Sequence, residues 1–380
     1  MSNRWKGGFI QAYFDPLTPG EEAAHNLYVW GKNDLGQLGL NTAINASSPT
    51  QSGAGEDWGP NATTGQYVGA NVKANGTLWV SGQNTNGVRG DNTAALNIIS
   101  SPVQIGALTT WSKISATRAQ FLALNQSNAL FSWGLGTQGA TGHNDTISRS
   151  SPVQVGSDTD WLSIHTSLFD SFVFKNNGTL WGMGQNLYGQ LGINNNLATS
   201  SPTQIGALSD WSKIGPGFRH CLAIKTDGTL WGWGDNSNGA VGNNSGIAVS
   251  SPVQVGALTN WADVSSTLYG SFGLKTDGTL WFWGDNASGE LGNNGAASVL
   301  SSPVQVGALT DWQNINAIYN AILATKTDGT LWGWGANDDG QLGFSPGGNV
   351  SSPTQVGSET DWNTYNIAAG ARTIWATVPK

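Results

Sequence analysis

The sequence predicts an all-β protein, a seven-bladed β-propeller of four-stranded blades that is closed by pairing of its N- and C-terminal strands. Three observations lead to this prediction. A phrase recurs seven times, with copies that begin 51, 52, 50, 50, 50 and 51 residues apart. Each copy contains apolar segments of strand length separated by turn residues, and the first and last copies are incomplete in complementary ways. Self-similarity at a fixed period of this size is typical of a repeat architecture.

The repeated phrase has a fixed internal order. It opens with a leucine followed within a few residues by aromatic residues and glycine, at Leu27, Leu78, Leu130, Leu180, Leu230, Leu280 and Leu331. A Gly/Asn-rich loop follows, then a Ser-Ser-Pro segment, and then a tryptophan at position 58, 111, 161, 211, 261, 312 or 362. Of the 19 tryptophans, only Trp5 and Trp375 lie outside the repeated positions, so we expect most of them to pack between blades against glycine.

The copy that begins at Trp211 shows how one repeat folds. Residues 211–214 alternate as a first strand, and residues 221–225 form a second, apolar strand. The pair Asp227-Gly228 then separates two apolar runs, which is the strongest local signal for a β-hairpin. Residues 230–234 are the returning strand. Residues 252–256 supply a fourth, whose proline stands at the strand start, where no ladder donor is needed.

The two chain ends predict how the repeats close. The first copy begins at residues 27–31 without its preceding hairpin partner, and the chain ends in residues 373–378 without a following Leu-Trp strand. We therefore expect residues 373–378 to pair beside residues 27–31 in one composite blade, which removes both open sheet edges. The predicted domains are an N-terminal aromatic-rich arm, residues 1–26, and the propeller, residues 27–380.

Composition excludes several classes of partner. Charged residues make up 11% of the chain, the net charge is -8 and the pI is about 4.8. Nucleic-acid binding depends on clustered Lys and Arg, so no nucleic-acid partner is expected. No apolar run approaches the ~20 residues of a spanning helix, and the N-terminus lacks a signal-peptide core, so neither membrane insertion nor general secretion is expected. Cys221 is the only cysteine and is expected to be a buried, inert thiol.

Residues 217–234, together with the Gly-Gln-Leu-Gly segments at 36–39, 189–192 and 340–343, resemble the repeat of the regulator of chromosome condensation family. The resemblance covers about residues 27–380 and implies a seven-bladed propeller with a shared closing blade. It also brings three known activities to compare with this chain. The founding member is a guanine-nucleotide exchange factor that binds nucleosomes, through a wedge inserted in one blade and a basic region. Here the repeats differ in length by at most two residues and the chain is acidic, so neither activity is expected.

Two other members of that fold point elsewhere. A plant ultraviolet photoreceptor uses a Gly-Trp-Arg-His motif, whose tryptophan is replaced here by Phe218. A secreted β-lactamase inhibitor of related architecture binds through aromatic residues on one face. The loop before each second strand carries such aromatics in five repeats: Tyr67, Phe169, Phe218, Tyr269 and Tyr319. Gathered on one face they suit a protein or glycan contact, although they could equally cap the central channel or pack under neighbouring loops.

No catalytic constellation is visible, so we predict a protein that is not an enzyme and has no cofactor. The histidines His25, His143, His165 and His220 have no metal-ligand spacing, and no base stands near the Ser-Ser-Pro serines. The Gly-rich loops open no helix and carry no phosphate-loop lysine. The Asn/Asp pairs in these loops are better explained as turn-forming residues than as calcium ligands.

The predicted arm carries Trp5, Phe9, Ile10, Tyr13 and Phe14, and then a turn-rich segment at residues 15–20. Residues 5–17 resemble N-terminal arms of virion proteins from tailed phages, and the arm either folds back on the propeller or docks into another subunit. Our leading hypothesis is a non-enzymatic structural or adhesion protein of a phage virion, a capsid decoration or tail component. Residues 1–26 would anchor it on other virion proteins. The loop face would be exposed and would contact a host-surface protein or glycan. The alternative is a cytoplasmic, soluble protein-binding module or enzyme inhibitor that acts through the aromatic loops.

Overall fold

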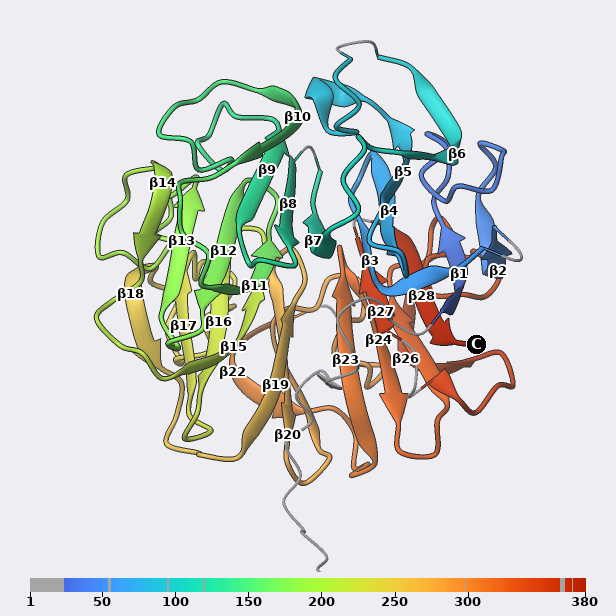
Figure 1. The fold of residues 1–380 in the computed structure, drawn as a ribbon. Coiled ribbons are helices and arrows are strands. Elements are labelled where there is room, and N and C mark those ends of the chain that lie inside the picture. Colours follow the sequence, from blue (N-terminus) through green and yellow to red (C-terminus); the bar gives the residue numbers. More distant parts are fainter. Residues whose placement is uncertain are drawn as a thin grey trace, which may run out of the picture.

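The computed structural model describes residues 24–53, 56–93, 96–118, 120–296, 298–362, 366–370 and 372–380. These residues form short β-strands and one 3₁₀ turn, η1 (Thr85–Gly87), and they contain no α-helix. The strands are grouped in sheets that surround a common centre (Figure 1). The all-β, four-stranded propeller architecture predicted from the sequence is therefore confirmed. Within the described residues, no helix has the length and apolar character needed to cross a membrane.

Five of the six sheets contain four antiparallel strands that follow one another in chain order. Their strands are β7 (Trp111–Ala116), β8 (Gln120–Asn125), β9 (Leu130–Gly134) and β10 (Arg149–Gln154); β11 (Trp161–Thr166), β12 (Asp170–Lys175), β13 (Leu180–Gly184) and β14 (Thr199–Gln204); β15 (Trp211–Pro216), β16 (His220–Lys225), β17 (Leu230–Gly234) and β18 (Val249–Gln254); β19 (Trp261–Ser266), β20 (Gly270–Lys275), β21 (Leu280–Asp285) and β22 (Val299–Gln305); β23 (Trp312–Ile318), β24 (Ala321–Lys326), β25 (Leu331–Gly335) and β26 (Val350–Val356).

The sixth sheet has eight strands and contains both ends of the described chain. Its strands are β1 (His25–Gly31), β2 (Ala46–Ser52), β3 (Trp58–Thr64), β4 (Val68–Lys73), β5 (Leu78–Gln83), β6 (Ile98–Gln104), β27 (Asn366–Ala369) and β28 (Thr373–Pro379). The order is β27-β28-β1-β3-β4-β5-β6, with β2 paired to β1. Strands β1 and β3 meet only at His25 and Trp58, so this sheet is two sets of four strands joined at one residue pair.

The strand pairing expected between the chain ends is present. Strand β28 lies antiparallel to β1 along its whole length, from Thr373 opposite Gly31 to Pro379 opposite His25. Figure 1 shows the two strands, blue and red, side by side. The indole Nε1 of Trp30 also donates to the carbonyl of Gln341 at 3.1 Å, which joins the first repeat to the last complete one.

The hairpin turn predicted at Asp227-Gly228 is also observed. Gly228 adopts φ +76°, and a Cβ there would lie 2.2 Å from the carbonyl oxygen of Thr259, so only glycine fits. The Asp227 carboxylate accepts from the backbone N–H of Thr229 at 2.9 Å and from its hydroxyl at 2.6 Å. That hydroxyl in turn accepts from the Trp231 indole at 2.9 Å, which ties the turn to the outer tryptophan.

At two prolines the strand boundaries differ from the sequence prediction. Strand β18 begins at Val249 and not at Pro252, which lies inside it, where the pairing with β17 is interrupted between Gly232 and Gly234. A missing N–H costs nothing there, because β18 is the outermost strand of its sheet and the interruption removes the ladder bond. Strand β15 lies at the other edge of the sheet and continues to Pro216, which pairs with Cys221 of β16.

Tryptophans hold neighbouring repeats together, as the sequence predicts. Five of them are fully buried and donate their indole Nε1 to a backbone carbonyl of the preceding repeat at 2.7–3.1 Å: Trp30, Trp133, Trp233, Trp283 and Trp334. The approach is close enough to require glycine. A Cβ on Gly192 would lie 2.8 Å from the Trp233 Nε1. The second glycine of the repeated Gly-Gln-Leu-Gly segment is therefore needed for packing between blades.

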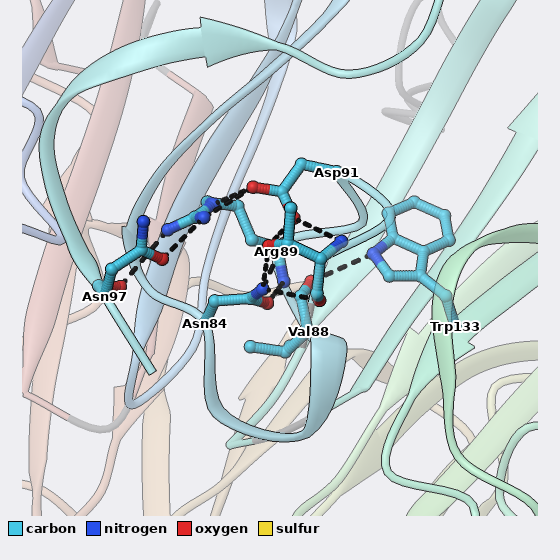
Figure 2. Close-up of polar contacts among 7 residues, drawn as sticks. Asn84, Val88, Arg89, Asp91, Asn97 and Trp133 are labelled. Atoms are coloured by element: carbon cyan, nitrogen blue, oxygen red, sulfur yellow. Dashed lines mark hydrogen bonds and ion pairs between the residues drawn. The ribbon is translucent and has the colours of Figure 1, made fainter. Parts of the chain in front are cut away.

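One repeat buries a charged side chain immediately before this glycine. Arg89 stands where other repeats have Leu38, Leu191, Leu291 and Leu342, and its side chain is 1% exposed. Its Nε donates to Asp91 at 2.6 Å, and its Nη atoms donate to the carbonyl and side-chain oxygens of Asn97 at 3.2 and 2.7 Å (Figure 2). Asn84 accepts from the Arg89 backbone N–H, which fixes the backbone of Arg89 against the start of the loop.

Candidate binding surface

The first strands of the repeats form the inner layer of the molecule. Neighbours lie beside one another in the order β3, β7, β11, β15, β19, β23 and β27, and β27 lies beside β3. The turn between the first and second strand therefore occupies an equivalent place in every repeat. It is the turn in which the sequence places the five aromatic residues.

Three of the five predicted aromatics are in contact with one another. The ring of Phe218 lies between those of Phe169 and Tyr269, with centroid distances of 6.4 and 6.1 Å. All three side chains are half-buried, so each ring keeps part of its surface open to solvent. Side chains from three repeats thus form one continuous row.

The other two aromatics pair with arginines instead. The Arg118 Nε donates to the Tyr67 hydroxyl at 3.2 Å, and its guanidinium lies 5.9 Å from the Tyr67 ring centroid. Arg372 lies 5.8 Å from the Tyr319 ring centroid and forms a 2.9 Å ion pair with Asp339. These arginines are also half-buried.

A third arginine, Arg219, extends the row. Its guanidinium lies 4.7 Å from the Phe218 ring centroid and 4.4 Å from that of Tyr188. Sequence reasoning did not include these arginines in the site, although each is one or two residues before a second strand, as the aromatics are. We name this set the aromatic–arginine belt: Tyr67, Arg118, Phe169, Phe218, Arg219, Tyr269, Tyr319 and Arg372.

Buried polar residues lie directly behind the belt, at the start of the second strands. The His220 imidazole pairs with the Ser271 hydroxyl of the next repeat at 2.9 Å, and burial lowers the pKa of His220 to about 4. The Gln120 amide makes the equivalent contact to Ser171, also at 2.9 Å. At the same position in β12, burial raises the pKa of the Asp170 carboxyl well above its usual range. The His220 and Gln120 contacts link neighbouring repeats, and all three residues begin the strand that follows a belt turn.

The belt is a surface and not a pocket. The cavity beside Arg219 and Tyr269, which reaches His220 and Asp235, has a volume of about 10 Å³. That is the room of a single water molecule. A small molecule therefore finds no enclosed site there, whereas a protein surface could cover the exposed ring faces and guanidiniums together.

The histidines and the loop asparagines singled out in the sequence have structural contacts. No three His, Cys, Asp or Glu side chains among the described residues are placed to hold a metal ion. His143 lies 2.9 Å from the Ser132 hydroxyl, but Ser132 is fully buried and donates to the Thr141 carbonyl, so this pair is structural. The asparagines of the loops also have structural roles. Asn236, for example, accepts from the Val241 N–H and donates to the Ser245 carbonyl.

The predicted arm contacts Trp5, Phe9, Ile10, Tyr13 and Phe14 lie outside the described residues. The first described strand begins at His25, ahead of the Leu27 boundary expected from the repeats.

Family models identify the repeats. The regulator of chromosome condensation (RCC1) repeat matches residues 25–56, 177–224, 227–272 and 328–374, and a second model of that repeat matches residues 211–240. None of the curated proteins matches the chain in sequence.

Solved structures share the whole architecture. Human WBSCR16 matches with a TM-score of 0.82 at 19% identity, over 94% of this chain and 99% of that one. Prp20p from Saccharomyces cerevisiae matches with a TM-score of 0.81 at 18% identity, over 95% and 93% of the two chains. Yeast RCC1 (Prp20) in its complex with Kap60 matches with a TM-score of 0.82 at 18% identity, over 100% and 94%. The repeat matches and the shared fold agree: the chain is an RCC1-like propeller that carries regulator of chromosome condensation (RCC1) repeats over the matched residues.

Proposed function

We propose that this protein is a non-enzymatic binding propeller that captures a protein partner on the aromatic–arginine belt. The observation that carries the proposal is the continuous row of Phe169, Phe218, Tyr269 and Arg219, contributed by three repeats and left half-exposed. Aromatic residues and arginine are the types enriched at the centres of protein interfaces. Host-surface protein is the partner class that these rings and guanidiniums fit best, and a glycan is the alternative occupant.

Closure into seven blades is part of the same proposal. The five four-stranded sheets and the two halves of the eight-stranded sheet make seven sets of four strands. The contact of β27 with β3 and the β1–β28 pairing support a closed ring spanning residues 27–380. A closed ring leaves only short, protected sheet edges, so it would hold the belt residues on a rigid base.

The structural relatives support the class of partner and not its identity. The Prp20p structure is described with binding properties toward Gsp1p and histones, and yeast RCC1 was solved bound to Kap60. Those partners are proteins. The net charge of -8 argues against binding to the phosphate backbone of DNA. A nucleosome role is therefore not proposed.

The belt proposal is tested by identifying a partner and then truncating the belt. A photo-crosslinking residue at Tyr269 should join the partner, and one at the exposed Leu197 of an outer loop should not. Phe218→Ala and Arg219→Ala should each then weaken partner binding by at least about 10-fold, the lower range of interface hot spots. Leu197→Ala is the matched control. An unchanged Kd in the Phe218→Ala and Tyr269→Ala variants, with unchanged unfolding midpoints, would refute the belt as the binding surface.

We also propose a setting for the protein, the surface of a phage virion, where residues 1–26 would anchor it as a capsid decoration or tail component. The sequence of the arm, with Trp5, Phe9, Ile10, Tyr13 and Phe14, is what supports this. A cytoplasmic binding module is the alternative setting, in which the belt would bind a cytoplasmic protein and not a host-surface one.

The arm proposal has its own test. Because Ala24 accepts a hydrogen bond from the Lys380 N–H at 3.0 Å, the truncation should remove residues 1–23 only and leave β1 intact. We expect this variant to keep its unfolding midpoint and to be absent from purified particles, as measured by mass spectrometry of the particles. Incorporation at the wild-type stoichiometry would show that the arm is not the anchor.

A further inference from the structure

Five repeats place a lysine at the end of the second strand, where its ammonium lies over two tryptophan rings. The distances from Nζ to the ring centroids are 3.6–5.2 Å. The lysines are Lys73, Lys175, Lys225, Lys275 and Lys326. Such cation–π contacts hold the ammonium group in a fixed, largely desolvated place at the end of the second strand in these five repeats.

Acidic residues neutralise this lysine in four of the five repeats. Lys175, Lys225 and Lys326 each pair with the aspartate 15 residues earlier in the sequence (175 − 160, 225 − 210 and 326 − 311), at 3.1, 3.5 and 3.4 Å. Lys73 pairs with Glu56. Of the two repeats without a lysine, one has Asn125 and Thr110 at these positions, and the last has Val378 in place of the lysine but keeps the acid, Asp361. Four of the five lysines are thus accompanied by an acid.

Lys275 breaks this rule. Its partner position holds Asn260, and no ion pair with Lys275 is formed within the described part of the chain. The backbone is the same as in the other repeats, because the Asn260 carbonyl accepts from the Thr276 N–H at 2.9 Å, as the Asp210 carbonyl does from Thr226 at 2.8 Å. The carboxylate nearest in sequence, Asp277, accepts from the N–H and hydroxyl of Thr279 in the hairpin turn. The ion-pairing acid at position 260 is therefore what this repeat lacks, while Asp277 still interacts electrostatically with Lys275.

The lysine without its acid lies in the wall of a cavity. This cavity has a volume of about 370 Å³, and the residues that line it include Lys275, Trp261 and Trp281 together with Asn243, Asn244 and Gln254. Lys275 itself is 6% exposed. The volume falls in the range of small-ligand sites, which combine apolar walls with a few fixed polar groups.

We propose that this cavity binds a sugar unit that bears a carboxylate, such as a uronic acid. The carboxylate would pair with the Lys275 ammonium as Asp210 pairs with Lys225, and the three amides would serve the hydroxyls. A buried cation without a counter-charge is unfavourable, so a carboxylate that enters gains an ion pair without the cost of creating the cation. The site is separate from the aromatic–arginine belt and does not depend on it.

The proposal is tested by titrating the full-length protein with D-glucuronate and a glucuronate-containing disaccharide, with D-glucose and acetate as the neutral-sugar and plain-carboxylate arms. Isothermal titration should give binding of the uronates that is at least tenfold tighter than that of glucose or acetate. Lys275→Met should lower uronate affinity at least tenfold. Asn260→Asp, which restores the acid found in the neighbouring repeats, should do the same while raising the unfolding midpoint, and Asp210→Asn in the intact repeat should leave uronate affinity unchanged.

Two results would overturn the proposal. Uronate affinity that survives Asn260→Asp would show that Lys275 does not hold the ligand, and this variant reproduces a pair that already folds in three repeats. Acetate binding as tightly as glucuronate would show a plain carboxylate site and exclude the sugar.

Discussion

Replacing Asp91 by alanine is expected to lower the free energy of unfolding by about 3 kcal/mol, because it leaves the Arg89 guanidinium buried without its counter-charge. Arg89 is 1% exposed, and Asp91 accepts from its Nε at 2.6 Å and forms an ion pair with its Nη2 at 2.5 Å. With Asp91 gone, only the Asn97 contacts of Figure 2 remain to satisfy the cation. The measurement is the urea midpoint and slope of the wild type and the variant.

Lowering the pH should also lower the free energy of unfolding of the wild type. Burial on its own raises the pKa of Asp91, but the hydrogen bonds from Thr93 and Arg89 and the charge of Arg89 together lower it below its usual value. A carboxyl whose pKa is lowered on folding contributes stability above its unfolded pKa and loses that contribution as pH falls through the folded pKa. The stability difference between wild type and Asp91→Ala should therefore be full at neutral pH and shrink below about pH 4.

A double variant provides the control for this prediction. Arg89→Leu with Asp91→Asn gives the repeat the residues that another repeat, β19–β22, carries as Leu291 and Asn293. Replacing a buried ion pair by packed apolar groups is often neutral or stabilising, so the double variant should unfold within about 1 kcal/mol of the wild type. If Asp91→Ala also stays within 1 kcal/mol, the pair is not what holds this loop.

The repeat pattern was sufficient to predict the sheets and the pairing of the chain ends. Asp227-Gly228 and residues 373–378 are examples. A turn, or a strand that lacks its partner, can be recognised from the sequence of a single repeat. Pro252 was misplaced for a related reason. A proline inside a strand is tolerated only at a bulge or an outer edge, and which strand is outermost depends on the assembled sheet.

The candidate site could be predicted less fully. The sequence places Phe169, Phe218 and Tyr269 in equivalent turns, and this equivalence was enough to group them. Arg219 was missed because its stacking on Tyr188 joins two loops of different repeats, and nothing in either loop alone indicates it. Lys275 and Asn260 could have been found from sequence, by comparing charge pairs at fixed separation across the repeats and not single positions.

Glu290→Gln is expected to remove a pH dependence of stability. Glu290 stands where other repeats have Gln37, Gln190 and Gln341, and it accepts the equivalent bond, from the Ser288 N–H at 2.8 Å. Its side chain is buried, and this burial is the main cause that raises the pKa of Glu290 from 4.5 to about 7. A glutamine makes the same hydrogen bond without a charge to desolvate.

The sign follows from proton binding. Between pH 4.5 and about 7 the folded protein binds a proton at Glu290 that the unfolded chain releases, so stability is full below pH 4.5 and is lost as pH rises through 7. The interval from 4.5 to about 7 corresponds to roughly 3 kcal/mol, so Glu290→Gln should be more stable than the wild type by about that amount at pH 8 and equal to it at pH 4. His165 and His220, whose burial lowers their pKa values to about 4, lose stability in the opposite direction, as pH falls. Because they are common to both proteins, the difference between the two urea-unfolding curves against pH isolates Glu290, and Gln341→Glu should create the same dependence in another repeat. Parallel curves from pH 4 to 8 would mean that Glu290 is ionised in the folded protein without penalty.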